Sequence, residues 1–291
     1  MSYIFSGFAD EAGWDLETQI RATKELGWSN IEMRFVKVAG FDGGNLHDIS
    51  DDAFLEVVEQ LGAANIRIHC FGSGIANGGK NIEKPFDADL ESTKRAAARM
   101  AKLGTKFVRI MSYPIRKDTE DQLEAERFRR LREIVSIFKD VGATTLHENC
   151  GNYGGMGWTY TLKMLDKVPG LKLAFDMGNC FHDLDYTKPT PHPYQNSWEF
   201  YEKVRDHIVH LHIKDGRLSE DGKHIHTYPG EGICDVKPIV DDLLKRGYKG
   251  VFSIEPHIGV APEFSALPEA EGKYRTYVKH GQILESIMPK A

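Results

Sequence analysis

A chain of 291 residues with a net charge of −6 and four cysteines is long enough for one large domain or two ordinary ones. The acidic balance disfavours a sequence-independent nucleic-acid binder, which usually presents a basic face. No apolar run approaches the roughly 20 residues that span a bilayer, and the N-terminus turns acidic too soon for a signal peptide. The cysteines form no C-x-x-C pair, which suits a reducing cytosol. We therefore expect a cytoplasmic globular protein without nucleic-acid or membrane partners.

Short apolar runs typical of strands alternate with amphipathic helical patterns along the chain. The expected strands are 3–8, 30–34, 66–70, 107–111, 144–148, 171–176, 207–213 and 251–255. The expected helices are about 16–26, 50–61, 89–103, 120–141, 159–167, 197–206, 235–246 and 269–287. Gly27, Gly104, Gly142 and Gly247 are placed to end four of these helices.

Eight such units in one chain of this length are what an α/β fold of the (β/α)₈ TIM-barrel type needs. A doubly wound open sheet is the alternative, although it usually needs fewer strands for one ligand site. No linker or low-complexity segment divides the chain, so we expect a single domain over 1–291. The basic run at 127–132 interleaves with an apolar helical stripe, and we interpret it as the solvated outer face of a barrel helix.

Four of the expected strands end at or near a residue that can bind a metal ion. These residues are Glu148, Asp176, His212 and Glu255. A single acid at a strand end is usually a helix cap, but the C-terminal ends of barrel strands meet where active sites form. Three carboxylates with one imidazole suit Mn²⁺, Co²⁺, Zn²⁺ or Mg²⁺, and the lack of thiolates disfavours a structural zinc. We therefore predict one divalent metal ion held by these four side chains.

The segments around these residues resemble a known family across essentially the whole chain. The matching pieces are H-E-N at Glu148, F-D-M-G-N at Asp176, H-L-H-I-K-D at His212, I-E-P-H at Glu255 and P-G-E-G-I-C-D at 229–235. They resemble the xylose-isomerase-like barrels of sugar isomerases and epimerases, with ketose epimerase, hydroxypyruvate isomerase and inosose dehydratase relatives. The resemblance implies a single ion, most often Mn²⁺, and a homo-oligomer, either a dimer or a tetramer.

The resemblance also implies a reaction. The carbonyl and a neighbouring hydroxyl of a keto-sugar or polyol would bind the ion, which would stabilise an enediolate. Glu148 and Glu255 would be the catalytic residues that remove a proton next to the carbonyl and return it. The expected activity is therefore that of an isomerase or epimerase in carbohydrate metabolism.

Two positions depart from the C3-epimerase branch of that family. Asn179 stands where that branch usually has a histidine, and Gly154 stands where it has a glutamate. Both family residues help to bind substrate, and the long loop at 180–196 indicates a different substrate cover. A lyase on the same barrel, which dehydrates a keto-inositol or eliminates from a 3-keto-glycoside, is therefore a close alternative.

Two further classes stay open. An apurinic-site endonuclease shares this fold, but its three zinc ions need more histidines at strand ends, where this chain has Arg109 and Asn179. A barrel that only binds a sugar is the non-enzyme alternative, and the intact pair of glutamates argues against it.

Residues around the ligands complete the expected site. His69, Asn179, Lys214 and Arg217 are candidates for substrate binding, against the alternative of ordinary strand-end or loop residues. Asn149, next to a ligand, is expected to support it. His147 and His210 alternate with leucines and are expected to face the other side of their strands. Glu32 and Arg109 would point into the barrel if the expected strand register holds.

Overall fold

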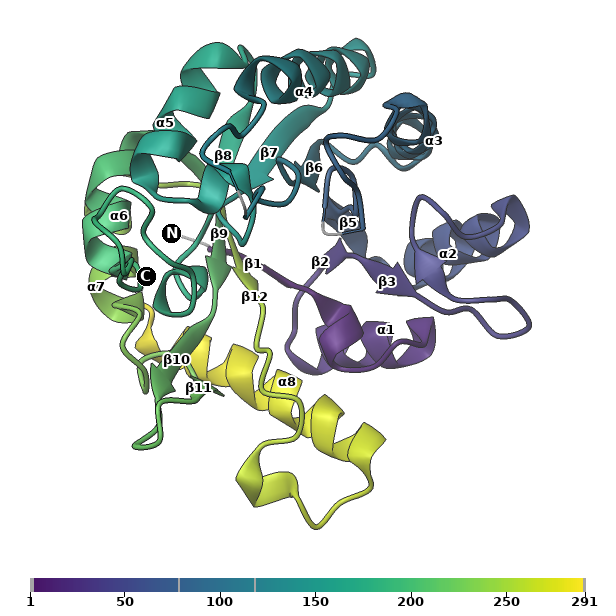
Figure 1. Ribbon diagram of the computed structural model, residues 1–291. Coiled ribbons are helices and arrows are strands. Elements are labelled where there is room, and N and C mark those ends of the chain that lie inside the picture. The colour runs from purple at the N-terminus through teal and green to yellow at the C-terminus, as the bar shows by residue number, and fades with distance from the viewer. Residues whose placement is uncertain (1–2, 78, 118, 290–291) are drawn as a thin grey trace.

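Eight parallel strands form a nearly closed barrel with helices around its outside (Figure 1). The computed structural model describes residues 3–77, 79–117 and 119–289. The strands follow the order β1-β12-β9-β8-β7-β6-β5-β2, and a parallel bridge between Phe8 and Glu32 joins the two ends of this sheet. The barrel strands are β1 (Ile4–Gly7), β2 (Asn30–Met33), β5 (Arg67–Gly72), β6 (Phe107–Ile110), β7 (Thr144–Glu148), β8 (Lys172–Asp176), β9 (Ile208–Ile213) and β12 (Val251–Ile254). The predicted (β/α)₈ architecture is confirmed.

A helix follows each barrel strand and covers its outer side. The helices are α1 (Leu16–Glu25), α2 (Asp51–Ala64), α3 (Asp87–Leu103), α4 (Glu124–Asp140), α5 (Trp158–Lys167), α6 (Ser197–Val204), α7 (Val236–Lys245) and α8 (Glu269–Ile287). Several ends lie where the sequence predicts them. The Ser50 side chain accepts a hydrogen bond from the Ala53 N–H at the start of α2, and Gly104 ends α3 with a φ of 69°.

Two short hairpins were not expected from the sequence. They are β3 (Phe35–Val36) with β4 (Gly44–Asn45), and β10 (Asp215–Leu218) with β11 (His224–Thr227). Both follow barrel strands at the C-terminal end of the barrel. β3 and β4 have only two residues each, too few for a periodic pattern, and β10 and β11 read D-G-R-L and H-I-H-T, without the apolar run that marks the barrel strands.

Helix α4 differs from its prediction in its start and in its basic run. It begins at Glu124 rather than near 120, because Leu123 takes a left-handed φ of 51°. Arg127 is fully buried and donates to the carbonyls of Ser112, Tyr113 and Pro114 at 2.6 to 3.0 Å. The interpretation of this run as a solvated face is therefore wrong for Arg127 and for the equally buried Arg130.

The interior of the barrel changes from apolar to polar along its axis. The main apolar core lies between the strands and the helices, whereas a small separate cluster inside the barrel consists of Cys70, Leu146 and Ala174. Side chains two residues apart on a strand share a face. Glu148 and Asp176, two residues after Leu146 and Ala174, therefore point into the barrel nearer the C-terminal ends of the strands.

None of the helices in the described ranges combines the length and the apolar character needed to cross a membrane.

Candidate metal centre

Four buried side chains converge at the C-terminal end of the barrel. Glu148 ends β7, Asp176 ends β8, His212 lies near the end of β9, and Glu255 directly follows β12. The Nδ1 atom of His212 lies 3.8 Å from a Glu148 oxygen, 3.9 Å from an Asp176 oxygen and 3.8 Å from a Glu255 oxygen. One ligand atom from each residue lies within 4.8 Å of the other three. The structure therefore brings together all four residues that the sequence selects as metal ligands.

The surroundings of the His212 ring fit a metal ion. Its Nδ1 atom is buried and has no hydrogen-bond partner among the described residues. The three oxygens around it lie beyond hydrogen-bonding distance. Buried carboxylates repel one another unless a cation lies among them. A divalent ion would satisfy the ring nitrogen and the three carboxylates at once, and the donor set suits Mn²⁺, Co²⁺, Mg²⁺ or Zn²⁺.

Protons compete with an ion for the same four groups. Burial, together with the charges of Glu255 and Glu148, raises the pKa of Asp176 to about 7 despite the opposing charge of Lys214. Burial lowers the pKa of His212, but Glu32 and Glu148 outweigh it and hold that pKa well above its usual range. An incoming ion would therefore displace protons from this group.

Lys214 lies among the proposed ligands. Its ammonium is 2.9 Å from an Asp176 oxygen, 3.0 Å from a Glu255 oxygen and 3.0 Å from Asn179 Oδ1. Burial lowers the pKa of Lys214, but the neighbouring carboxylates outweigh it and raise that pKa well above its usual range. The ammonium neutralises only one of the three negative charges that these carboxylates carry when ionised. Lys214 and the ion can therefore share this group of carboxylates.

Two arginines hold the proposed catalytic glutamates. Arg109 Nε lies 3.3 Å from Glu148, and Arg34 Nη1 lies 3.1 Å from Glu255. Burial raises the pKa of Glu148, but the charge of Arg109 outweighs it and the pKa falls to about 2. Gly72 leaves room for the Phe8 ring and the base of the Arg34 side chain, because a Cβ atom there would lie 2.5 Å from Phe8 Cε1 and 3.1 Å from Arg34 Cβ. Burial raises the pKa of Glu255, but the charges of Lys214 and His257 outweigh it and hold that pKa well below its usual range. Both glutamates are therefore ionised at neutral pH.

Two asparagines fix the loops that carry the ligands. The Asn149 side chain donates to the Asp176 carbonyl and accepts from the Asp176 N–H, both at 2.8 Å. The Asn179 side chain donates to Glu148 at 2.9 Å and accepts from Lys214 at 3.0 Å. Asn149 thus holds the end of β8 in place, and Asn179 links a ligand of one strand to the lysine of another.

The packing around position 154 explains why the chain has a glycine there. A Cβ atom there would lie 2.4 Å from His147 Cε1 and 2.7 Å from the end of Met164. The His147 ring is fixed in turn, because its Nε2 lies 3.0 Å from both Ser112 and Asn152. The packing around position 154 therefore leaves no room for the glutamate of the C3-epimerase branch.

Asp215 organises the loop that contains the P-G-E-G segment. Its buried carboxylate accepts hydrogen bonds from the backbone N–H groups of Gly230, Gly232 and Cys234 at 2.8 to 3.1 Å. A Cβ atom at Gly232 would lie 2.1 Å from the Asp215 carboxylate. The two matching motifs are thus parts of one structural unit beside the site.

The structure does not bring every candidate residue to the metal ligands. The half-buried ring of His69 stacks on Phe107, the first residue of β6, with their centroids 5.3 Å apart. Arg217 is exposed on the β10–β11 hairpin. His147 faces away from the ligands toward Ser112 and Asn152, as predicted.

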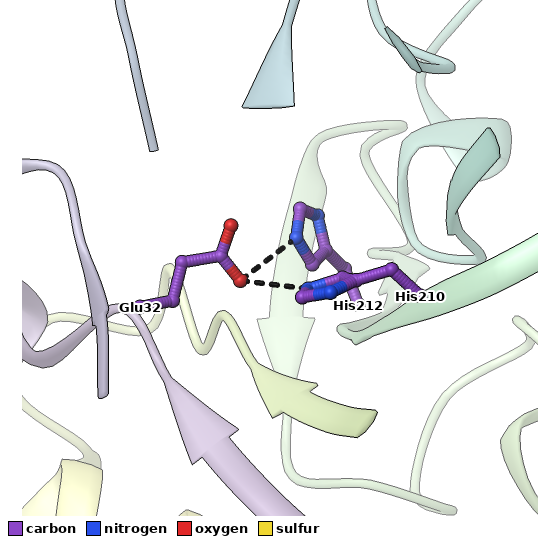
Figure 2. A group of neighbouring side chains, drawn as sticks. All are labelled: Glu32, His210 and His212. Atoms are coloured by element: carbon purple, nitrogen blue, oxygen red, sulfur yellow. Dashed lines mark hydrogen bonds and ion pairs between the residues drawn. The ribbon is translucent and has the colours of Figure 1, made fainter. Parts of the chain in front are cut away.

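The prediction for His210 is wrong. It lies inside the barrel, where its Nε2 is 2.8 Å from a Glu32 oxygen, and His212 Nε2 lies 3.2 Å from the same oxygen (Figure 2). The signal was present in the sequence, because residues two apart on a strand share a face and His212 was already selected. Burial raises the pKa of Glu32, but the two histidines outweigh it and hold that pKa well below its usual range.

A cavity of about 700 Å³ opens beside the site. His257 links the cavity to the ligands, since its Nε2 lies 2.9 Å from Glu255 and its side chain is 39% exposed. The exposed ring of Trp14 packs at a tilt on Phe35, with their centroids 4.7 Å apart. The lining includes Asp10, Glu11, Trp14, Arg34, His257 and Lys273. Such a volume can hold a small polar ligand.

Comparison with known proteins agrees with this geometry. A family model described as a xylose isomerase-like TIM barrel matches residues 20–275. A xylose isomerase-like TIM barrel protein from Mycobacterium smegmatis, solved in complex with magnesium, superposes with a TM-score of 0.69 at 16% identity, covering 99% of this chain and 100% of that one.

Curated relatives match over shorter segments. Fructoselysine 3-epimerase of Escherichia coli O157:H7 is 34% identical over 56 residues, which is 19% of this chain and 19% of that protein. Inosose dehydratase of Histophilus somni is 33% identical over 97 residues, which is 28% of this chain and 30% of that protein. These matches therefore span less than two thirds of the relatives' own lengths.

Proposed function

Since the chain belongs to the xylose isomerase-like TIM barrel family, we propose that it is a metal-dependent enzyme that isomerises or epimerises a keto-sugar or related polyol. The observation that carries this proposal is the placement of Glu148 and Glu255. Each offers one oxygen 3.8 Å from His212 Nδ1, and they come from β7 and from the end of β12. Two carboxylates that approach one small group from different strands can take a proton on one side and return it on the other.

The proposed ion is held by Glu148, Asp176, His212 and Glu255. When bound, a divalent cation there supplies Lewis acidity toward a carbonyl and makes the neighbouring C–H more acidic. The mixed oxygen and nitrogen donors are compatible with Mn²⁺, Co²⁺, Mg²⁺ and Zn²⁺, and Mn²⁺ is our first candidate because of the resemblance to sugar isomerases and epimerases. The related Mycobacterium smegmatis protein in complex with magnesium supports the choice of a divalent cation.

The remaining residues prepare the two glutamates and hold the substrate. The charge of Arg109 keeps Glu148 ionised, and the charges of Lys214 and His257 keep Glu255 ionised, so that both can accept a proton at neutral pH. Lys214 lies close enough to the carboxylates to bind a hydroxyl or an oxyanion of the substrate, and Asn179 holds Lys214 in place. The cavity past His257 offers room for the part of the polyol that does not react.

A lyase is the second candidate, and the positions of Asn179 and Gly154 favour it. Asn179 is bonded to protein groups on both sides of its amide, and Gly154 has no room for a longer side chain. The two contacts that a C3-epimerase makes through those positions are therefore missing. The match to an inosose dehydratase supports a reaction in which the same proton abstraction is followed by loss of water or of an aglycone.

Solvent isotope exchange separates these candidates. The Mn²⁺-loaded protein would be incubated in D₂O with ketoses, keto-inositols and a 3-keto-glycoside, and the products followed by NMR and mass spectrometry. Deuterium next to the carbonyl of an isomeric product supports the isomerase, whereas an unsaturated product or a released aglycone shows the lyase. If none of these compounds took up deuterium or gave a product, the proposal would be contradicted.

Matched variants test the roles of the glutamates. Glu148→Gln and Glu255→Gln should each abolish exchange, because an amide cannot take up the proton. Glu231→Gln, which changes an exposed acid of a neighbouring loop, should leave exchange unchanged. Full turnover by Glu255→Gln would rule out its role in proton transfer.

Three expectations from the sequence stay predictions. They are a single domain over 1–291, a homo-oligomer and a cytoplasmic location. Light scattering, limited proteolysis and cell fractionation would check them.

A further inference from the structure

A buried polar network lies just below the proposed metal ligands. One oxygen of Glu32 lies 2.8 Å from His210 Nε2, 3.2 Å from His212 Nε2 and 2.7 Å from Ser253 Oγ. The four residues come from β2, β9 and β12, and each is at most 1% exposed. Figure 2 shows both imidazole rings directed at this one oxygen.

The network determines which nitrogen of His212 carries a fixed proton. An oxygen that accepts from Ser253 and from two rings needs a proton on each Nε2 atom. Nε2 of His212 is therefore a donor to Glu32, and the other ring nitrogen, Nδ1, faces Glu148, Asp176 and Glu255. Nδ1 of His212 is the nitrogen that remains free to bind an ion.

Neighbouring groups keep the ring in this orientation. The Phe8 ring packs edge-on against His212 with their centroids 5.0 Å apart, and the His210 ring does the same at 5.0 Å. A flipped ring would point a carbon atom at Glu32 and leave the carboxylate short of one donor in a buried site.

We propose that Glu32 is a positioning residue that directs Nδ1 of His212 at the metal ion, with His210 and Ser253 holding Glu32 in place. This inference rests on the metal dependence proposed above but not on the reaction that follows. A carboxylate behind a metal-binding histidine fixes its tautomer and increases its basicity, and loss of such a partner weakens metal affinity by roughly 10–100-fold.

The same three residues could instead hold a second ion. Glu32, His210 and His212 offer ligand atoms within 4.8 Å of one another. However, both imidazole contacts have ordinary hydrogen-bond lengths, and Ser253 already shares the oxygen. A single ion above the network accounts for the orphaned Nδ1 of His212, and a second ion below it is not needed.

Metal titration of matched variants tests the proposal. Glu32→Gln keeps an acceptor oxygen of the same shape without the charge, and we expect it to bind Mn²⁺ about 10-fold or more weaker with the stoichiometry unchanged. Ser253→Ala should weaken binding less. Ser6→Ala is the matched control, because Ser6 pairs in register with Ser253, is equally buried and bonds to none of the described groups. It should bind Mn²⁺ like the parent protein.

A spectroscopic readout separates positioning from a general loss of structure. In the Co²⁺-loaded protein, the Nε2 proton of a Co²⁺-bound histidine gives a hyperfine-shifted NMR signal that exchanges with solvent. We expect this signal to exchange slowly in the parent protein and in Ser6→Ala, and quickly in Glu32→Gln. The proposal would be overturned if Glu32→Gln bound Mn²⁺ as tightly as the parent protein. It would also be overturned if the parent protein bound two ions and this variant bound one. Neither measurement requires a substrate, so a failed test of the reaction leaves this one intact.

Discussion

The two halves of the barrel contribute different kinds of side chain to the candidate site. The neighbouring strands β7, β8, β9 and β12 bring the three carboxylates and the imidazole that can bind an ion. The opposite half brings the residues that hold them, with Glu32 on β2, Arg34 directly after it and Arg109 on β6. Gly72 on β5 contributes by having no side chain, which leaves room for the Phe8 ring and the base of the Arg34 side chain. All four ligands thus come from one half, and Glu32 and the two arginines come from the other. Asn149, Asn179 and Lys214 add support from within the ligand half.

This division determines how mutations should act. Loss of a ligand should remove the ion, whereas loss of a supporting charge should leave a buried carboxylate without its partner and destabilise the fold. Variants on the two sides therefore test whether the division is real.

The largest effect is expected for Asp176→Asn in the ligand half. The amide keeps the shape of the side chain but loses the charge, so Mn²⁺ affinity should fall by more than the roughly 100-fold limit for residues that only orient a ligand. Isothermal titration would measure it. Asp185→Asn, a buried acid of a mouth loop that bonds to Thr187, is the control and should bind Mn²⁺ normally. An affinity loss below 10-fold in Asp176→Asn would remove Asp176 from the ligand set.

Arg109→Met tests the supporting half. It leaves the buried Glu148 carboxylate unpaired, and breaking such a pair typically costs about 3–5 kcal/mol. Urea denaturation in the presence of a chelator would measure the free energy of unfolding. Arg129→Met removes an exposed arginine that pairs with Glu126 on α4 and should cost less than about 1 kcal/mol.

The double variant sharpens this test. Arg109→Met combined with Glu148→Gln removes both charges. The double variant should therefore lose less free energy of unfolding than Arg109→Met alone. If the loss in the double variant equalled the sum of the losses in the two single variants, the arginine would stabilise the barrel by packing only.

Metal affinity should rise with pH. Burial and the neighbouring carboxylates raise the pKa of Asp176 to about 7, so below that pH the carboxyl carries a proton that an ion must displace. Affinity should fall by about 10-fold per pH unit for each displaced proton as the pH drops below 7. Calorimetric titrations from pH 5.5 to 8 in buffers of different ionisation enthalpy would give the Mn²⁺ affinity and the number of protons displaced on binding. An affinity independent of pH would contradict this environment for Asp176.

The smallest effect is expected for Gly154→Ala. The added Cβ atom meets His147 and Met164, and overpacking of this kind costs about 1–3 kcal/mol. Gly62→Ala is the control, since Gly62 lies inside α2 with open space around its missing Cβ. It should be stabilising by about 0.5–1 kcal/mol. Equal stability of the two variants would mean that sterics do not explain Gly154.

The same division explains what could be predicted from the sequence. The ligand half could be found because each ligand stands at the end of its own strand, so the order of elements alone places the four together. The supporting half could be found only in part. Glu32 and Arg109 were expected inside the barrel on condition of the strand register, but their partners depend on that register, including a shift between Ile31 and Glu32 where β2 pairs with β5. One residue of register turns a side chain to the other face.

Local sequence also misled in specific places. The apolar neighbours of His210, Val209 and Leu211, suggested a histidine that faces away. However, β9 is buried on both faces, so the apolar residues do not mark which face points into the barrel. Arg127 was assigned to solvent because the basic run interleaves with an apolar stripe, although its guanidinium donates to three backbone carbonyls of the segment after β6. In both cases the tertiary partners decide the environment, and they lie far away in the sequence.

The proposed metal site is tested most directly by a crystal structure of the Mn²⁺-loaded protein with anomalous data at the manganese edge. We expect one anomalous peak per chain, bonded to Nδ1 of His212 and to Glu148, Asp176 and Glu255. A peak between Glu32, His210 and His212, or no peak at saturating Mn²⁺, would contradict it.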